Sequence, residues 1–366
     1  MKATYRILIT LVIILITLGV VLVLGASNGI RKDYSMLFSH LVKVAVALGA
    51  MLYFASFPYE KYKKHSKKIM FAIIILLVLT LIIGIAKKGA SRWLNVGLFS
   101  FQPAELAKIF IIIHLANLIE KKGKLIRDFK NGFVHIITWL FVVVGLIVLQ
   151  PNLSTSILIM FVGFSMLFVA GAGAKHLIVT TLITGILGLM LLFSFNHSRE
   201  RLLSHFGYAK EESIDLQSYQ SSVALGSGGL TGKGIGHSRQ SDLFLPEAYG
   251  DFIYAILGEQ LGFIGTVLVL LIYLAIFVLG VLISFKCPDV FGKMLGFGLT
   301  LSITVNAVVN AAVVSNTIPV TGITLPFVSF GGTSIVTFGF AVGIIINIAL
   351  TLIKSREAVA ANEVLN

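Results

Sequence analysis

Apolar residues form ten long runs along this chain, separated by short polar segments and one long one. A helix needs about 20 consecutive apolar residues to cross the hydrocarbon core of a bilayer, and the runs approach or exceed this length. The pattern therefore predicts an all-α integral membrane protein with about ten transmembrane helices in one bundle. The predicted spans are 6–24, 36–57, 69–86, 102–119, 133–150, 153–173, 177–196, 251–284, 291–314 and 327–353.

Lysine and arginine are concentrated in alternate connections between the predicted spans. They cluster at 61–68 and 121–130, and others lie before the first span and after the last. Because positively charged loops stay on the cytoplasmic side, this bias places both termini in the cytoplasm. The long polar loop 197–250, between the seventh and eighth spans, then lies outside. No small-residue cleavage site follows the first span cleanly, so we interpret that span as a retained helix.

The predicted organisation is one polytopic domain over residues 1–355 and a short cytoplasmic tail, 356–366, that is expected to be disordered. Hydrophobic residues make up 57% of the chain and charged residues only 12%. A net charge of +13 would suggest a nucleic-acid partner in a soluble protein. Here membrane orientation accounts for the basic clusters, so we expect no nucleic-acid binding. The single cysteine, Cys287, excludes an internal disulfide and is expected to be inert.

Four proline- or glycine-rich polar segments fall at the predicted outer ends of the helices, although the topology depends on lysine and arginine alone. Six glycines between Gly226 and Gly236 allow close backbone approach to a ligand and expose N–H groups to anions. This stretch matches neither a Walker loop nor a dinucleotide fingerprint. The convergence predicts a single outer site. The segments are SRWLNVGLFSFQPAELAK (91–108), QPNLSTS (150–156), residues 219–263, which include the glycine-rich stretch 226–236, and PVTGITLPFVSFGGTS (319–334).

Asp251 is the candidate general base. It opens the eighth span, where an aspartate often caps a helix and contributes roughly 1 kcal/mol. Its place at the outer face, beside the glycine-rich stretch, equally suits a carboxylate that accepts a proton from an acceptor hydroxyl. Glu247, four residues earlier, is a supporting candidate that is either solvated or anchors the loop. Glu259 is expected further along the helix, within the membrane, where a partner has to compensate its charge.

Glu105 and Lys108 lie three residues apart in the fourth span and therefore share a helix face. Ionisable residues inside a span usually face the bundle interior or a watery cavity. A functional pair and a structural pair are both open interpretations, and Lys108 could also reach outward to the headgroups. Lys43 in the second span is interpreted as reaching outward in this way.

Three outer cations are candidates for holding a phosphate: Arg92 beside the interfacial Trp93, and Lys233 and Arg239 in the long loop. Arginine in particular can clamp a phosphate through paired N–H groups. With Asp251 they suit a diphosphate substrate whose tail lies in lipid. The histidines show no metal-ligand spacing, and neither HExxH nor GxSxG occurs. The patterns of a zinc protease and of a serine hydrolase are therefore missing.

Three of these segments together resemble the SEDS family (shape, elongation, division and sporulation), whose members include RodA, FtsW and SpoVE. The resemblance covers nearly the whole chain and implies a multi-pass protein of the bacterial cytoplasmic membrane. It implies a peptidoglycan glycosyltransferase that polymerises lipid II, the undecaprenyl-diphosphate-linked disaccharide pentapeptide, at the outer face. GHSRQ (236–240) favours an FtsW- or SpoVE-like protein over a RodA-like one. The segments are RWLNVGLFSFQPAELAK, LPEAYGDFIYAILGEQLGFIG and PVTGITLPFVSFGGTS.

The resemblance also implies roles for residues and partners. Asp251 corresponds to the essential carboxylate of the LPEA-x-x-D segment, and Glu105 and Lys108 to the charged pair of the QP-x-ELAK segment. Asn152, which stands where the family usually has aspartate, and Ser329 are further candidates for substrate contacts. The family implies a class B penicillin-binding protein as transpeptidase partner, with other divisome or elongasome membrane proteins. The cofactor stays open, since a divalent cation such as Mg²⁺ or Mn²⁺ would suit a diphosphate leaving group.

Two other functions remain as alternatives. A lipid II flippase would need a polar path through the bundle, whereas the polar motifs here gather at the outer face. A non-catalytic scaffold that recruits a transpeptidase would not depend on Asp251. The concentration of motifs at one membrane face favours the enzyme.

Overall fold

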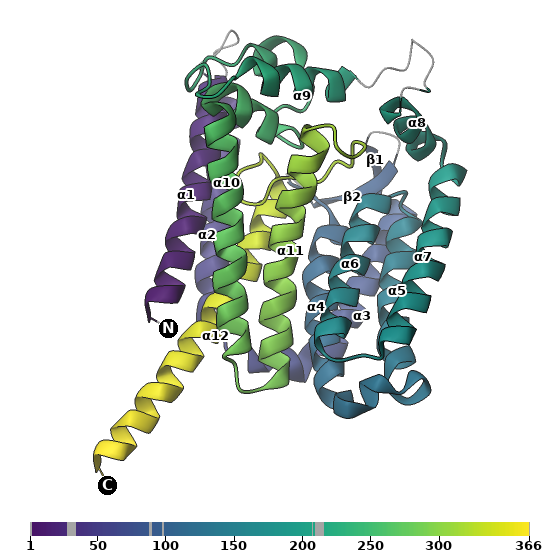
Figure 1. Ribbon diagram of the computed structural model, residues 1–366, viewed down its shortest axis with the longest axis vertical. Coiled ribbons are helices and arrows are strands. Elements are labelled where there is room, and N and C mark those ends of the chain that lie inside the picture. Colours follow the sequence, from purple (N-terminus) through teal and green to yellow (C-terminus); the bar gives the residue numbers. More distant parts are fainter. Residues whose placement is uncertain are drawn as a thin grey trace.

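The chain folds as a bundle of long helices topped by shorter elements (Figure 1). The computed structural model describes residues 2–27, 34–87, 90–96, 99–206, 208 and 216–365. Ten long helices in this part of the chain match the ten predicted spans, which confirms the predicted fold class. They are α1 (Lys2–Ser27), α2 (Ser35–Ser56), α3 (Glu60–Ile83), α4 (Pro103–Lys122), α5 (Val134–Val148), α6 (Leu153–Val169), α7 (Ala174–Ser194), α10 (Ile253–Phe285), α11 (Val290–Val314) and α12 (Gly332–Leu365).

Eight of the described helices are long and apolar enough to cross a membrane, judged by length and composition. Of the other two long helices, α6 is apolar but has only 17 residues. α4 carries Glu105, Lys108 and Glu120 among its 20 residues. Both helices pack against α11, and most of α4 is buried. Protein therefore surrounds Glu105 and Lys108, as ionisable groups within a span require.

Both ends of the described chain lie at the same end of the bundle, as the predicted topology requires (Figure 1). The basic connection after α4, formed by η1 (Gly123–Arg127) and η2 (Phe129–Phe133), lies at that end too. The opposite end carries α8 (Asn196–His205) and α9 (Leu216–Ser227). The positive-inside rule assigns the basic end to the cytoplasm. The long loop between α7 and α10 therefore faces outside.

Two outer segments contain secondary structure that the hydrophobic pattern did not predict. The connection before α4 forms a three-stranded antiparallel sheet of β1 (Ile85–Lys87), β2 (Ala90–Val96) and β3 (Phe99–Phe101). The strands pair backbone groups that would otherwise lack partners close to lipid. In the long outer loop, α9 is followed by η4 (Gln240–Phe244), a π-helical turn.

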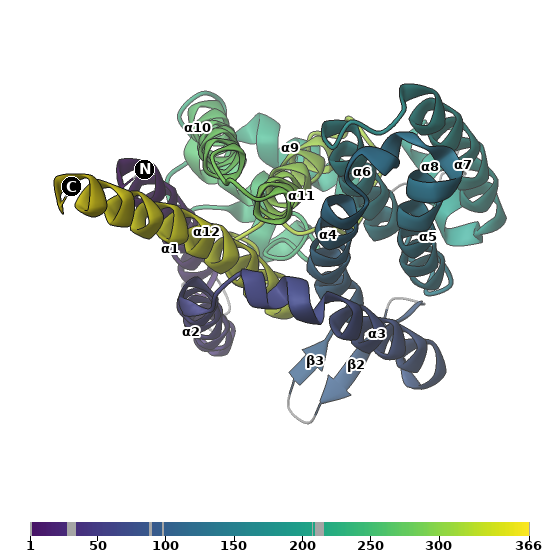
Figure 2. The ribbon, with the colours of Figure 1, turned by 90° about the horizontal axis from the view of Figure 1, so that it is seen from below.

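The C-terminal tail differs from the prediction. α12 continues to Leu365, and the Lys2 ammonium lies 2.6 Å from the carboxylate of Glu357. Figure 2 shows α12 projecting beyond the bundle on the side of α1. The tail is rich in Ala and Glu, which are strong helix formers, so the helix continues past the last apolar turn. The expectation of a disordered tail is therefore wrong for residues 356–365.

α12 packs closely along α2. A Cβ atom on Gly339 would lie 2.5 Å from the backbone oxygen of Ala47, and one on Gly343 would lie 2.6 Å from that of Met51. Small residues allow helix backbones in a membrane to approach closely, so that dispersion contacts can hold them together. α7, in contrast, lies at the edge of the bundle, with most of its side chains exposed (Figure 2). The bundle therefore has its tightest packing around α12.

Cys287 lies in the cytoplasmic turn between α10 and α11 and is buried. Its thiol donates a hydrogen bond to Oδ1 of Asp289 at 3.1 Å, and the Tyr59 hydroxyl donates to the same oxygen at 2.6 Å. Burial, together with the hydrogen bond to Asp289, raises the pKa of the Cys287 thiol to about 12. The thiolate is the reactive form of cysteine. We therefore expect folded protein to resist maleimide at pH 8 and denatured protein to be labelled.

Tyr208→Cys provides the control for this labelling, because Tyr208 is 81% exposed in the outer loop. A membrane-impermeant maleimide added to spheroplasts should label Tyr208→Cys and leave the wild type unlabelled. Rapid labelling of Cys287 in the folded wild type would contradict its burial. Labelling of Tyr208→Cys only after lysis would contradict the topology.

Candidate functional site

Asp251 lies in the turn that leads into α10, at the outer end of the bundle. The N-cap of α10 is Phe252, which makes no side-chain capping hydrogen bond, so Asp251 is not the cap residue. A Cβ atom placed on Gly322 would lie 3.4 Å from Oδ2 of Asp251. The Nδ2 of Asn310 in α11 donates at 2.7 Å to the carbonyl oxygens of both Asp251 and Ile323. Asn310 therefore links the backbone of Asp251 to the turn that precedes α12, and the carboxylate lies beside Gly322 of that turn.

The turn before α12 is stabilised by its own hydrogen bonds. Ser329 is buried, and its Oγ accepts from the backbone N–H of Leu325 at 2.8 Å. The N–H of Phe330 donates at 2.7 Å to the carbonyl of Tyr249, two residues before Asp251. Ser329, predicted to contact the substrate, thus shapes the turn that faces Asp251. Because the Ser329 oxygen accepts this bond, the hydroxyl can still donate its own proton to another group.

Glu105 and Lys108 form a buried ion pair at the outer end of α4. The ammonium of Lys108 lies 2.9 Å from the Glu105 carboxylate and 3.3 Å from Oδ1 of Asn306 in α11. Lys108 therefore points into the bundle, which excludes the interpretation that it reaches outward to the headgroups. The backbone N–H of Gln102 donates to Thr333 Oγ1 at 3.1 Å and links the start of α4 to the start of α12.

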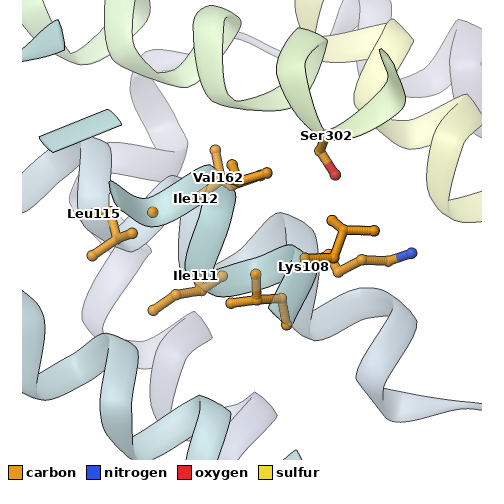
Figure 3. A pocket seen from close by; sticks show the side chains of 9 residues that line it. Lys108, Ile111, Ile112, Leu115, Val162 and Ser302 are labelled. Carbon is orange, nitrogen blue, oxygen red and sulfur yellow. The ribbon is translucent and has the colours of Figure 1, made fainter. Parts of the chain in front are cut away.

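The stem of Lys108 lines a narrow apolar hollow between α4, α6 and α11 (Figure 3). No part of this hollow is wide enough for a water molecule. It therefore provides no aqueous path toward the cytoplasm in this structure. Its lining residues are Lys108, Ile111, Ile112, Leu115, Leu158, Ile159, Val162, Gly163 and Ser302.

Lys108→Met is expected to lower the stability of the protein by about 3 to 5 kcal/mol, because it leaves the buried Glu105 carboxylate without its cation. The double variant Glu105→Gln, Lys108→Met removes both charges and should recover most of that loss. Thermal unfolding in detergent measures both changes. A double variant as unstable as the single one would contradict a mutually compensating pair.

Arg92 of β2 is anchored to the turn between α5 and α6. Its Nε donates to the carbonyl of Gln150 at 3.2 Å, and one of its terminal nitrogens donates to that of Pro151. Burial lowers the pKa of the Arg92 guanidinium, and the positive charge of Arg201 lowers it further. Arg201 of α8 in turn donates at 3.2 Å to the carbonyl of Val320, in the turn that faces Asp251. The guanidinium groups of Arg92 and Arg201 are therefore close enough at the outer face to interact electrostatically.

The sequence reasoning did not single out Arg201. It is separated from Arg92 by more than a hundred residues and resembles any other solvated cation of the long loop. The only signal in the sequence was its position in a loop already assigned to the outer face. Folding brings it to the 319–334 turn, which makes it part of the candidate site.

Asn152 is buried and acts as the N-cap of α6, where its side chain accepts a weak hydrogen bond of 3.4 Å from the N–H of Thr155. Among the described residues its Nδ2 has no hydrogen-bond partner. Asn152 adjoins the two carbonyl groups that hold Arg92. Its capping role explains why an amide can replace a carboxylate here, since both side chains accept a backbone N–H.

Glu259 lies three residues before an interruption of α10 at Gly262 (φ +68°, ψ −169°), and it has the charge partner that the sequence required. Its fully buried carboxylate accepts hydrogen bonds from Lys233 Nζ at 2.8 Å and Ser238 Oγ at 2.5 Å. The backbone N–H of Gln240 adds a third at 3.2 Å. Lys233, predicted to hold a phosphate, therefore serves to anchor the glycine-rich stretch.

The glycines of this stretch pack against the outer end of α10. A Cβ atom on Gly228 would lie 2.0 Å from the carbonyl oxygen of Gly258, and one on Gly232 would lie 2.1 Å from that of Gln260. The N–H of Lys233 donates to Glu259 O at 2.9 Å. The glycines are thus needed for close contact within the chain. This use of their backbone differs from the predicted approach to a ligand.

Arg239 and Glu247 are both exposed. Arg239 contributes its backbone N–H to the Glu259 carboxylate, at 3.3 Å. Glu247 has a left-handed backbone conformation (φ +57°), and its carbonyl accepts from the N–H of Gly250 at 2.9 Å. Its role in the local turn agrees with the predicted loop anchoring. Within the described residues, no three His, Cys, Asp or Glu side chains are grouped so that they could hold a metal ion.

Comparison with known proteins places the chain in a family. The model of the FtsW/RodA/SpoVE cell cycle proteins matches residues 5–353. Stage V sporulation protein E of Bacillus subtilis is 36% identical over 93% of this chain and 96% of its own length. A protein of Geobacter metallireducens named probable peptidoglycan glycosyltransferase FtsW is 31% identical over 94% of both chains.

Solved structures share the fold. A chain of a peptidoglycan synthase complex superposes with a TM-score of 0.79, at 23% identity over 94% of this chain and 97% of that one. The rod shape determining protein RodA of Thermus thermophilus gives a TM-score of 0.71, at 24% identity over 94% and 95%. These findings confirm the resemblance that the outer-face motifs predicted. The chain therefore belongs to the FtsW/RodA/SpoVE family of cell cycle proteins.

Proposed function

We propose that this protein is a peptidoglycan glycosyltransferase that polymerises lipid II at the outer face of the bacterial inner membrane. The observation that carries the proposal is the position of Asp251, a partly exposed residue whose backbone carbonyl accepts from Asn310 and whose carboxylate lies beside Gly322 at the outer end of the bundle. Relatives 30–33% identical are named probable peptidoglycan glycosyltransferase FtsW. A lipid-anchored sugar donor presents its headgroup at this same level of the membrane.

The proposed chemistry begins with Asp251. The acceptor sugar hydroxyl attacks the anomeric carbon of the donor and loses its proton as the new glycosidic bond forms. A carboxylate aligned with that hydroxyl accepts the proton and lowers the barrier. The hydrogen bond from Asn310 to the Asp251 carbonyl fixes the backbone from which the carboxylate projects.

The leaving group is a diphosphate, on which negative charge develops as its bond to the sugar breaks. We assign the stabilisation of this charge to Arg92 and Arg201. The assignment is supported by the hydrogen bond from Arg201 to Val320, two residues before Gly322. A guanidinium has five N–H donors, so the hydrogen bonds that anchor Arg92 leave others for phosphate oxygens. A diphosphate does not need protonation to depart, so one carboxylate suffices where glycosidases use two.

The proposal includes a class B penicillin-binding protein as partner, which would cross-link the new strands. Its support is the similarity of the fold to a chain of a solved peptidoglycan synthase complex. Other membrane proteins of the divisome or elongasome remain predictions from the family. The higher identity to SpoVE and FtsW proteins than to the solved RodA agrees with the division-type motifs.

Reconstitution with the partner and fluorescent lipid II tests the proposal. The expected product is a ladder of glycan strands on a gel. Transfer of lipid II between leaflets without any polymer would favour the flippase. Polymerisation that depends wholly on the partner and is unaffected by changes at Asp251 would favour the scaffold.

A further inference from the structure

Lys43 places a positive charge inside a membrane-spanning helix. It lies eight residues after the start of α2, roughly 12 Å below the outer end of that helix. In the described part of the chain it forms no ion pair with a carboxylate. Such a charge is costly within a bilayer unless something compensates it. Its only described compensation is the ring of Phe330, whose centroid lies 3.5 Å from Nζ.

Lys43 faces the boundary between protein and lipid. Leu41, Val42 and Val46, which surround it on α2, are 43%, 37% and 53% exposed, so this side of the helix meets acyl chains. On the protein side, a Cβ atom on Gly332 would lie 3.7 Å from Cε of Lys43. The absence of a side chain at that glycine leaves space beside the ammonium.

His40 lies one turn earlier on the same face of α2 and is fully buried. Neither of its ring nitrogens has a hydrogen-bond partner among the described residues. Its ring centroid lies 5.7 Å from that of Phe330, the ring beneath Lys43. A buried polar group without a partner is uncommon. Within the ranges that the structure describes, a histidine without a hydrogen-bond partner and a lysine without a paired carboxylate therefore occur together here.

This cluster of His40, Lys43 and Phe330 is directly connected to the candidate active site. The N–H of Phe330 donates at 2.7 Å to the carbonyl of Tyr249, two residues before Asp251. A ligand beside Lys43 would therefore lie next to the segment that carries the proposed base. It would also remain in contact with lipid through the exposed face of α2.

We propose that Lys43 binds the phosphate groups of a polyprenyl-diphosphate lipid that reaches the site laterally from the outer leaflet. The diphosphate supplies the negative charge that the protein lacks here, and the polyprenyl chain lies along the apolar surface of α2. The choice of lipid rests on the proposed glycosyltransferase function. His40 is a polar neighbour that becomes hydrogen-bonded when the phosphate is present.

Binding of undecaprenyl diphosphate to the purified protein, measured by native mass spectrometry, tests this site directly. Lys43→Met should weaken binding at least about 10-fold, whereas Lys43→Arg should retain it. Lys61→Met is the matched control, because Lys61 lies 5.1 Å from the ring centroid of Phe57 at the cytoplasmic end of the bundle. Undecaprenol, which lacks the charge, should bind the wild type and Lys43→Met equally.

Several outcomes would overturn the proposal. Equal binding of undecaprenyl diphosphate by the wild type and Lys43→Met would exclude the site. If the wild type bound phosphatidylglycerol as tightly as undecaprenyl diphosphate, the site would be one for anionic lipids in general and the proposed specificity for a diphosphate would be wrong. If Lys43→Met does not fold, Lys43→Gln, which removes the charge and keeps a polar side chain, is compared with the wild type instead. His40→Phe, which keeps Lys43, should weaken binding less than Lys43→Gln.

The site and the proposed function can fail independently. Loss of binding in Lys43→Met, with no polymerisation by the wild type, would leave the lipid site standing and reject the enzyme. Polymerisation by the wild type, with unchanged lipid binding in Lys43→Met, would support the enzyme and reject the lipid site at Lys43. In the enzyme assay we expect Lys43→Met to raise KM at least about 10-fold with kcat nearly unchanged, because Lys43 binds the lipid and does not accept the proton.

Discussion

Asp251→Asn is expected to reduce glycan polymerisation by about 10² to 10⁴-fold, the range typical for loss of a general base. Asparagine has nearly the same shape as aspartate and fits the same space beside Gly322, but it cannot accept the proton of the acceptor hydroxyl. The hydrogen bond from Asn310 goes to the backbone carbonyl of residue 251 and is unaffected. The rate of polymer formation from fluorescent lipid II, with the partner present, is the measurement.

Asp128→Asn is the matched control. Asp128 caps η2 at the cytoplasmic end, where its Oδ1 accepts from the N–H of Asn131 at 2.6 Å. Asparagine can cap equally well, so polymerisation should remain within about twofold of the wild type. A folded Asp251→Asn protein with wild-type polymerisation would exclude Asp251 as the base. Thermal unfolding of both variants identifies any loss of activity that comes from misfolding.

The helical bundle could be predicted from the sequence because a membrane imposes a simple requirement. Every backbone group within the hydrocarbon must be paired inside the protein, so each long apolar run becomes a helix. The distribution of lysine and arginine then gives the orientation. These rules are local in the sequence, and neither needs a knowledge of which helices touch.

The contacts of the site are not local, and sequence reasoning recovered them only in part. Nothing in the run ILGEQLGFIG indicates that Gly262 breaks the helix, because glycine is common in membrane helices. Without knowledge of that break, the contacts between Glu259 and the glycine-rich stretch could not be predicted, and Lys233 appeared available for a phosphate. Similarly, Arg92 could be identified from its motif, whereas the position of Arg201 near it results from the folding of the long loop and could not be predicted from a motif.

Glu259→Ala is expected to destabilise the protein by about 2 to 4 kcal/mol, because each buried donor that loses its acceptor costs about 1 to 3 kcal/mol, whereas the ammonium of Lys233, 35% exposed, can be hydrated. The fully buried carboxylate accepts hydrogen bonds from the side chains of Lys233 and Ser238 and from the backbone N–H of Gln240. Alanine leaves all three donors without this acceptor. The glycine-rich stretch should then detach from α10, and its hydrogen exchange should rise together with a fall in the unfolding temperature.

Glu120→Ala is the comparison for this loss, because Glu120 pairs with Lys63 at the cytoplasmic end in a partly exposed setting. Exposed pairs contribute about 1 kcal/mol or less, so its unfolding temperature should change little. Equal melting of Glu259→Ala and Glu120→Ala would contradict the anchoring role of Glu259. Faster exchange restricted to residues 228–240 in Glu259→Ala would show that the carboxylate holds this stretch against α10. Because Asp251 lies on the chain between that stretch and Glu259, polymerisation should fall with it.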